Sequence, residues 1–387
     1  MTMRKLVYKG GLLLLLALWT VPTLFATPVS STSLDASAPK REFTRSIKKE
    51  FAISATGQVT LGNKYGKIHV DTWDEDQVKI EVTITVNAGT ENRAEAIFDR
   101  LQIEFENSPN SVRAETNIES SKDNWTSSWW DEKGKGEFKI EYEVFMPRTC
   151  NLDVSNKYGH TTVAALESNA KVTAKYGDVY MTSLTGDLDL DIGYGNANIE
   201  RSNDAKVLIK YGKLRLNEAR DIKMDSKYSK IDLTKVRDLD LYSKYNHYRL
   251  GDLQSLNIQG KYDDFEVESV REIKSDCSYT DFEVHQLHST GKFTMRYGSL
   301  HVEKLERDFA KVEVDGEYTG VKIDVENGAA YSMDIATSHA GVTYPDGANI
   351  HYDVEQNSRK QIRGTIGGQE GERMIRVRSS YGHIRIR

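Results

Sequence analysis

A short motif built around Lys-Tyr-Gly recurs through the 387 residues and constrains the fold more than any other feature. Its tyrosines are Tyr65, Tyr158, Tyr176, Tyr194, Tyr211, Tyr228, Tyr245, Tyr262, Tyr279, Tyr297, Tyr318 and Tyr381. The spacing is nearly constant from Tyr158 to Tyr297 and lengthens slightly on the way to Tyr318 and to His339, which keeps the frame without a tyrosine. Units this short cannot bury a core alone, so they must stack on one another.

Apolar and polar residues alternate on both sides of each tyrosine. In KVTAKYGDVYMTSL, Val172 and Ala174 share the parity of Tyr176, and Val179 and Met181 continue the apolar set. Alternation of period two predicts strands with one buried face. Each unit should therefore hold two short strands with a corner at the Tyr-Gly step, where glycine tolerates a positive φ. The tyrosine rings are expected to pack inward with the core, and the alternative is an exposed stripe that binds sugars.

These units, stacked in register, predict an all-β fold: a single-stranded parallel β-solenoid (β-helix) with coils of about 17–21 residues. Equivalent side chains would form ladders about 4.8 Å apart, and parallel crossovers favour right-handed coils. Residues 42–148 are expected to form a small mixed α/β N-terminal cap, with strands at 78–86 and 138–146 and a helix at 91–101. Residues 149–344 would form the repeats, and residues 345–387 the closing strands.

The N-terminus predicts export. Arg4, Lys5 and Lys9 precede an apolar stretch, residues 12–24, and Ala26 offers a small residue for cleavage. This layout is typical of a secretory signal peptide over residues 1–26, with an uncleaved membrane anchor as the alternative. Residues 27–41 are small and polar and are expected to form a flexible leader. The predicted location is the periplasm, the outer-membrane surface or the extracellular space, with no transmembrane span once the signal is removed.

Net charge limits the classes of binding partner, and the positions of the cysteines limit disulfide formation. The formal net charge of −6 argues against nucleic-acid binding, which needs a basic face. Cys150 and Cys277 would lie seven coils apart, about 34 Å at the expected spacing, so two free thiols are predicted.

The sequence predicts no metal site and no cofactor. Two nearby histidines, His285 and His288, lack a third ligand close in sequence. No particular oligomeric state is predicted.

Two sets of residues are candidates for ligand binding. The lysine before the tyrosine forms a row with outward parity, which includes Lys157, Lys175, Lys210, Lys227, Lys244 and Lys261. The row could bind an anionic polymer such as surface polysaccharide, or it could be a solvated ladder balanced by Asp178, Asp225, Asp264 and Asp281. Trp125, Trp129 and Trp130 lie in a polar loop, where they could bind sugars or close the end of the solenoid.

Signatures of catalysis are missing from the sequence. It contains no H-E-x-x-H, no G-x-S-x-G and no phosphate-binding loop, and no catalytic residues are predicted. The alternative is a polysaccharide-active β-helix enzyme, a lyase or hydrolase. Its best local carboxylates are Asp263, Asp264 and Glu266 and, one coil on, Asp281 and Glu283.

Three segments together resemble a known family. A strand that ends in proline runs into the repeats as EYEVFMPRTCNLDVSNKYGHTTV, and the chain closes with GTIGG and RMIRVRSSYGHIRIR. From Glu42 to Arg387 this is similar to the bacterial putative adhesin family of exported β-solenoids, which are like the heads of auto-transporter adhesins. The resemblance implies a cell-envelope or surface location, an adhesive or scaffold role toward a polymer or an envelope protein, and no catalytic residues.

Overall fold

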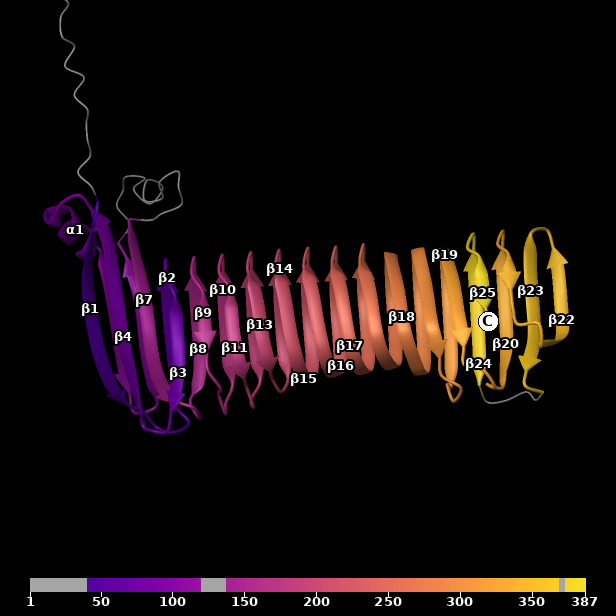
Figure 1. Cartoon of the computed structure of the whole chain (residues 1–387), viewed down its shortest axis with the longest axis horizontal. Coiled ribbons are helices and arrows are strands. Elements are labelled where there is room, and N and C mark those ends of the chain that lie inside the picture. Colours follow the sequence, from indigo (N-terminus) through magenta and orange to yellow (C-terminus); the bar gives the residue numbers. More distant parts are fainter. Residues whose placement is uncertain (1–39, 120–136, 369–372) are drawn as a thin grey trace, which may run out of the picture. The chain divides into compact units, whose positions relative to one another are not determined.

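The computed structural model describes residues 40–119, 137–368 and 373–387. Contacts between Cα atoms divide the chain into Met1–Ala38 and Pro39–Arg387, and the fold below is that of the second unit. It is all-β apart from one short helix, and its strands form one largely parallel sheet that winds from coil to coil (Figure 1). Within the described ranges, no helix has the length and apolarity that a membrane span requires.

Each repeat contributes an extended segment before its tyrosine and one after it, and equivalent segments pair in parallel; from β15 on, consecutive segments merge into longer strands. Ala170 pairs with Leu188, and Leu188 pairs in turn with Ala205, so the pairing register follows the sequence repeat. The strands are β8 Asn151–Lys157, β9 Thr161–Val163, β10 Ala170–Lys175, β11 Val179–Ser183, β12 Leu188–Gly193, β13 Asn196–Arg201, β14 Ala205–Lys210, β15 Lys213–Lys227, β16 Lys230–Lys244, β17 His247–Lys261, β18 Asp264–Leu305 and β19 Lys311–Val325.

The core lies between the strands before the corner and the strands after it. The alternating apolar residues predicted to be inside, such as Val172, Ala174 and Val179, are fully buried. Aromatic side chains also stack inside the coils: the ring centroids of Phe265 and Tyr248 are 4.4 Å apart. The buried hydroxyl of Tyr248 is hydrogen-bonded to the hydroxyls of Ser226 and Ser243, which satisfies its polar atom.

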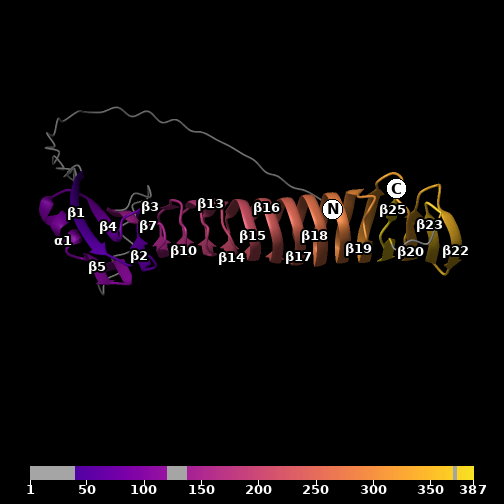
Figure 2. The same cartoon turned by 90° about the horizontal axis from the view of Figure 1, so that it is seen from below.

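The N-terminal segment covers the first coil with strands that pair in parallel with that coil and are extended outward by antiparallel strands. Its elements are β1 Arg41–Ala52, β2 Gln58–Lys64, β3 Ile68–Trp73, β4 Gln77–Ala88, α1 Glu91–Phe98, β5 Leu101–Ser108, β6 Ser111–Ile118 and β7 Phe138–Pro147. The β2–β3 coil stacks on β8 and β9, β7 pairs in parallel with β3, and β4 pairs antiparallel with β7 and β1. Helix α1 lies at the β1 end of the sheet (Figure 2), where Thr90 caps it and Ala94, Ile97 and Phe98 are buried. The predicted strands of this segment are confirmed, and the predicted helix forms but ends at Phe98, because Leu101 begins β5.

The last strands of the chain do not lie last in the sheet. The C-terminal elements are β20 Tyr331–Ser338, β21 Val342–Thr343, β22 Asn349–Gln356, β23 Arg359–Ile366, β24 Met374–Ser380 and β25 Ile384–Ile386. β24 pairs in parallel with β19 on one side and with β20 on the other, and β23 and β22 follow antiparallel. The coil of Tyr381 is therefore inserted between the coils of Tyr318 and His339 (Figure 1). The repeat spacing had placed His339 directly after Tyr318.

Candidate functional site: an exposed tyrosine ladder beside a lysine row

The corner of each repeat is made by the tyrosine itself, which adopts a left-handed backbone conformation. φ lies between 51° and 64° at all twelve repeat tyrosines and is 55° at His339. This conformation interrupts the alternation of an extended strand. As a result Lys175 and Tyr176 both face solvent, while Ala174 and Val179 on either side remain buried.

The role predicted for the glycine after the tyrosine is wrong, because the positive φ belongs to the tyrosine. The glycine is needed for close approach between coils: a Cβ on Gly195 would lie 2.0 Å from the carbonyl oxygen of Gly177 in the preceding coil. Other coils replace this glycine with a polar residue. There Ser229 donates its backbone N–H to Oδ1 of Asn246, and Asn246 donates its own to Oδ1 of Asp263, both at 2.8 Å.

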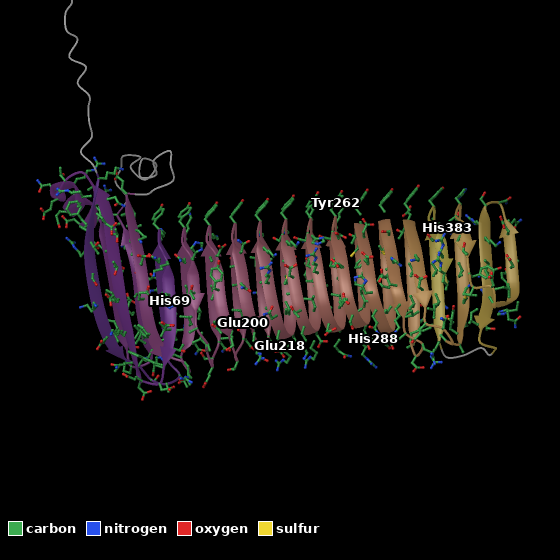
Figure 3. All side chains as sticks on the ribbon, in the orientation of Figure 1. His69, Glu200, Glu218, Tyr262, His288 and His383 are labelled. Carbon is green, nitrogen blue, oxygen red and sulfur yellow. The ribbon has the colours of Figure 1, made fainter. Side chains whose placement is uncertain are left out.

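The corner side chains form a continuous stack on the outside of the fold, which we call the tyrosine ladder. Its members, in spatial order, are Tyr65, Tyr158, Tyr176, Tyr194, Tyr211, Tyr228, Tyr245, Tyr262, Tyr279, Tyr297, Tyr318, Tyr381 and His339. Neighbouring ring centroids are 4.7–5.1 Å apart, and ring planes differ by 2–20°. The prediction that the rings pack inward is wrong: from Tyr158 to Tyr381 they are 36–53% exposed. Tyr262 projects from the edge of the sheet in Figure 3.

Stacking determines which part of each ring can meet a ligand. The face of every ring within the ladder is covered by its neighbours, so a sugar cannot lie flat on it as it does on an isolated aromatic residue. The ring edges and the hydroxyl groups remain accessible. From Tyr176 to Tyr381 no ladder hydroxyl has a hydrogen-bond partner among the described residues, and each can both donate and accept.

A row of lysines, which we call the lysine row, runs along one side of the ladder. It contains Lys64, Lys157, Lys175, Lys210, Lys227, Lys244 and Lys261. The parallel register places Lys210, Lys227, Lys244 and Lys261 opposite one another on four consecutive coils. Some ammonium groups lie against the ladder, since Nζ of Lys261 is 4.9 Å from the ring centroid of Tyr262.

Acidic residues near the corner do not neutralise this row. Of the four aspartates considered from the sequence, only Asp225 forms an ion pair with a row lysine, at 3.9 Å from Nζ of Lys227. The others have different partners: Asp178 accepts from Asn196, Asp264 lies beside His247, and Asp281 accepts from Ser299. Like charges at coil spacing repel one another, so the four consecutive lysines favour a bound anion.

The tryptophan candidates lie outside the described residues. Trp125, Trp129 and Trp130 belong to residues 120–136, and binding by them stays a prediction. The signal segment, residues 1–26, also lies outside the described ranges.

The carboxylates considered for catalysis do not converge. Asp263 points into the fold, where it is 4% exposed, and burial raises the pKa of its carboxyl group. Glu266 lies on the outer surface and accepts a hydrogen bond from Arg249 at 3.1 Å. Asp264 and Asp281 have the partners described above, and Glu283 belongs to a different cluster. These five carboxylates form no acid–base pair around a common cavity.

Both cysteines are free thiols, as predicted, and both are buried. Burial raises the pKa of Cys150 and raises that of Cys277 to about 12. Neither thiol is therefore a reactive nucleophile.

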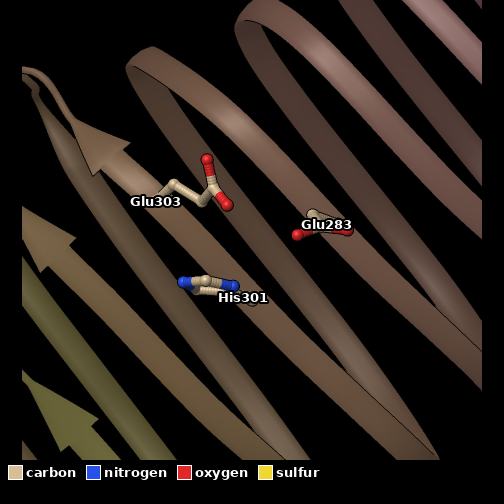
Figure 4. Close-up of side chains that lie close together, drawn as sticks. All are labelled: Glu283, His301 and Glu303. Atoms are coloured by element: carbon tan, nitrogen blue, oxygen red, sulfur yellow. The ribbon is translucent and has the colours of Figure 1, made fainter.

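A cluster of carboxylates and histidines on β18 was missed by the sequence analysis (Figure 4). Glu283, His301 and Glu303 bring one ligand atom each to within 4.8 Å of one another. His285, on the coil of Glu283, lies with Nδ1 2.7 Å from Oε2 of Glu303. The members come from two neighbouring coils, and only an alignment of the sequence by its repeat would have placed them together.

Part of the repeat array matches a family model. Residues 209–387, just under half of the chain, match the model of the Toastrack DUF4097 family. The match covers the coils from Tyr211 through the inserted Tyr381 coil, and the predicted resemblance to adhesin-like solenoids is confirmed. No curated protein matches the chain.

Three solved structures with some likeness to this chain are distant from it in sequence. A putative cell adhesion protein from Clostridium sporogenes has 8% identity and a TM-score of 0.17, covering 88% of this chain and 99% of its own. A putative adhesin from Bacteroides fragilis has 11% identity and a TM-score of 0.23, covering 89% and 97%. A putative lipid binding protein from Parabacteroides distasonis has 14% identity and a TM-score of 0.22, covering 88% and 96%. With TM-scores this low, these likenesses carry no argument about this chain.

Proposed function

We propose that the chain is an exported, non-enzymatic envelope or surface protein that binds a linear anionic polymer, such as an acidic polysaccharide, along the tyrosine ladder and the lysine row. The observation that carries the proposal is the run of lysines on four consecutive coils beside exposed tyrosine edges. Of these four lysines, only Lys227 has a carboxylate partner among the described residues. The proposal includes right-handed winding of the coils and cleavage of the signal peptide.

The chemistry of this surface favours anionic groups over neutral sugars. Ammonium groups form charge-assisted hydrogen bonds with carboxylates or sulfates, which are about twice as strong as neutral ones. The tyrosine hydroxyls offer further donors at the same spacing, because neighbouring rings are 4.7–5.1 Å apart. A ligand with regularly repeated charges can use several coils at once, and linked contacts of this kind raise affinity without a deep pocket.

The experiment is a binding titration of residues 27–387 with polygalacturonate, a linear polyanion, and with a neutral linear glucan. We expect saturable binding to polygalacturonate only, with an affinity that falls as salt is raised, because bound lysines release counterions. The variant K210Q/K227Q/K244Q/K261Q should bind about tenfold more weakly or worse, a loss of about 1.4 kcal/mol.

A matched control removes the same charge from positions outside the lysine row. Lys206, Lys223, Lys235 and Lys274 are exposed and lie outside the lysine row, so the variant K206Q/K223Q/K235Q/K274Q should bind within about twofold of the parent. Equal losses in both variants would mean that net charge, and not the ladder edge, attracts the polymer. Equal binding of the neutral glucan would contradict recognition of charge. Release of shortened products, followed by mass spectrometry, would favour the polysaccharide-active enzyme.

A further inference from the structure

The carboxylate–histidine cluster of β18 lies on the strand face that follows the tyrosine corner. Glu283 is four residues after Tyr279 and His301 is four residues after Tyr297, so they occupy the same position on neighbouring coils. His285 and Glu303 occupy the position two residues further along, and Glu303 is in turn opposite His285. Carboxylate and imidazole therefore alternate in both directions on a two-by-two patch of the outer surface.

We propose that Glu283, His301 and Glu303 form a binding site for a divalent transition-metal ion such as Zn²⁺. One imidazole nitrogen and two carboxylate oxygens already converge, with all three ligand atoms within 4.8 Å of one another (Figure 4). In a tetrahedral zinc site with bonds of about 2.0–2.2 Å, ligand atoms are roughly 3.3 Å apart. Side-chain rotation would have to close this separation, because the paired strands of the stack hold the backbone in place.

The type of ligand selects the type of ion. An imidazole nitrogen suits zinc and its neighbours in the first transition row, whereas Ca²⁺ and Mg²⁺ prefer sites made of oxygen alone. Three protein ligands leave at least one position for water, as in open zinc sites. We therefore expect Zn²⁺ to bind in preference to Mg²⁺ and Ca²⁺.

Neighbouring residues orient the ligands. His285 Nδ1 lies 2.7 Å from Oε2 of Glu303, which leaves the other oxygen of Glu303 for the ion. His285 also lies 3.9 Å from Glu266 and from Glu268 through Nε2, so it is a positioning residue held among carboxylates. Metal ligands commonly depend on such outer hydrogen bonds for their orientation.

The ammonium group of Lys322 lies beside the proposed metal site, and its removal tests the proposal. Nζ of Lys322 lies 2.7 Å from Nε2 of His301 and 3.0 Å from Oδ2 of Asp324. A positive charge at this distance opposes a bound divalent ion. Removing it should therefore tighten metal binding, which a merely structural ion-pair network would not do.

The test is calorimetric titration of the untagged mature protein, residues 27–387, with Zn²⁺, Mg²⁺ and Ca²⁺, together with the visible absorption of Co²⁺ as a report on coordination. We expect one zinc ion per chain. His301→Gln and Glu303→Gln should weaken binding by about tenfold or more, and Lys322→Gln should strengthen it by a few-fold. Thermal melts without metal report whether each variant folds.

The matched control is His247→Gln, since His247 is a surface histidine beside a single carboxylate, Asp264, on the same strand face. It should leave zinc affinity within about twofold of the parent. Equal weakening by His247→Gln and His301→Gln would mean scattered binding to surface histidines and would overturn the site. Failure of folded parent protein to bind zinc at millimolar concentration would overturn it as well.

Discussion

At the residue scale, the left-handed backbone of the corners does not by itself require tyrosine. A left-handed conformation costs an ordinary L-residue about 1–2 kcal/mol, and glycine or asparagine adopts it more readily. Twelve of the thirteen corners nevertheless carry tyrosine, and the other carries His339. An aromatic pair contributes about 0.5–1.5 kcal/mol beyond burial, so stacking on two neighbours offsets the strain. Stacking and strain are therefore of similar size, and the exposed ring edges are the part of the ladder that the proposed function uses.

Tyr228→Asn tests this balance. The substitution removes stacking on Tyr211 and Tyr245, at 5.0 and 4.8 Å, and relieves the left-handed strain, so the free energy of unfolding should change by less than about 1 kcal/mol. Leu241→Ala, in the adjacent core, should cost about 2–5 kcal/mol in the same denaturant titration. A loss at Tyr228 as large as that at Leu241 would make the ladder chiefly structural.

A second residue-scale prediction concerns Asp263. Its carboxyl group is buried, Oδ2 has no hydrogen-bond partner within the described part of the chain, and desolvation raises its pKa in the folded state. A raised carboxyl pKa favours the protonated form in the fold, so stability is highest below the unfolded-state pKa and falls as pH rises through the folded-state value.

Asp263→Asn removes this titration. The stability of the variant relative to the parent should therefore increase between about pH 4 and neutral pH, whatever the constant effect of the amide. Melting temperatures of both proteins across this range check the prediction. Asp281→Asn, at an exposed carboxylate, is the control. If the melting temperatures of the parent and Asp263→Asn changed with pH in parallel, the predicted titration of Asp263 would be contradicted.

At the element scale, β24 joins the last hairpin to the repeats. It pairs with β19 on one edge and β20 on the other, and Val377 is fully buried between Val314 and Ile335. β20, β23 and β22 reach the solenoid only through this strand on the face before the corner. Disruption of β24 should therefore release them together.

Val377→Asp tests this joint. An unpaired carboxylate in the core is strongly unfavourable, so β24 should detach. Amide hydrogen exchange should then accelerate by at least about tenfold in β20–β23 and stay slow in β15–β17. Arg378→Ser, at an exposed position of the same strand, should leave both regions protected. Uniform acceleration along the chain would instead indicate a single cooperative unit.

At the scale of the whole molecule, the repeat predicted most of the fold. Its alternation placed Val172, Leu214 and Phe265 inside, and its spacing set the parallel register. The direction of the tyrosine side chains could not be predicted. Counting alternate residues as buried and exposed assumes an extended backbone through the corner, but each corner residue is left-handed, which reverses the alternation after it. The order of the last coils was also hidden, since the Tyr381 and His339 motifs suit the same position equally well.

The two candidate sites differ in how far the sequence alone predicted them. The lysine row was visible because its lysines all stand directly before a repeat tyrosine. The metal-ligand cluster was not, because Glu283 and His301 come from different coils and neither belongs to a recurrent motif. Sites that form between coils become visible only when the coils are aligned with one another.

The place of β24 also affects how the protein can be made. Synthesis or export from the N-terminus delivers β20–β23 before β24, yet β20 has no neighbour on its solenoid side until β24 arrives. Successive coils up to β19 can be added as they emerge, but the final hairpin must wait, held away from the β19 edge. Vectorial growth thus stops at β19, and the last step is an insertion, which keeps an exposed strand edge open until the end of the chain has been synthesised.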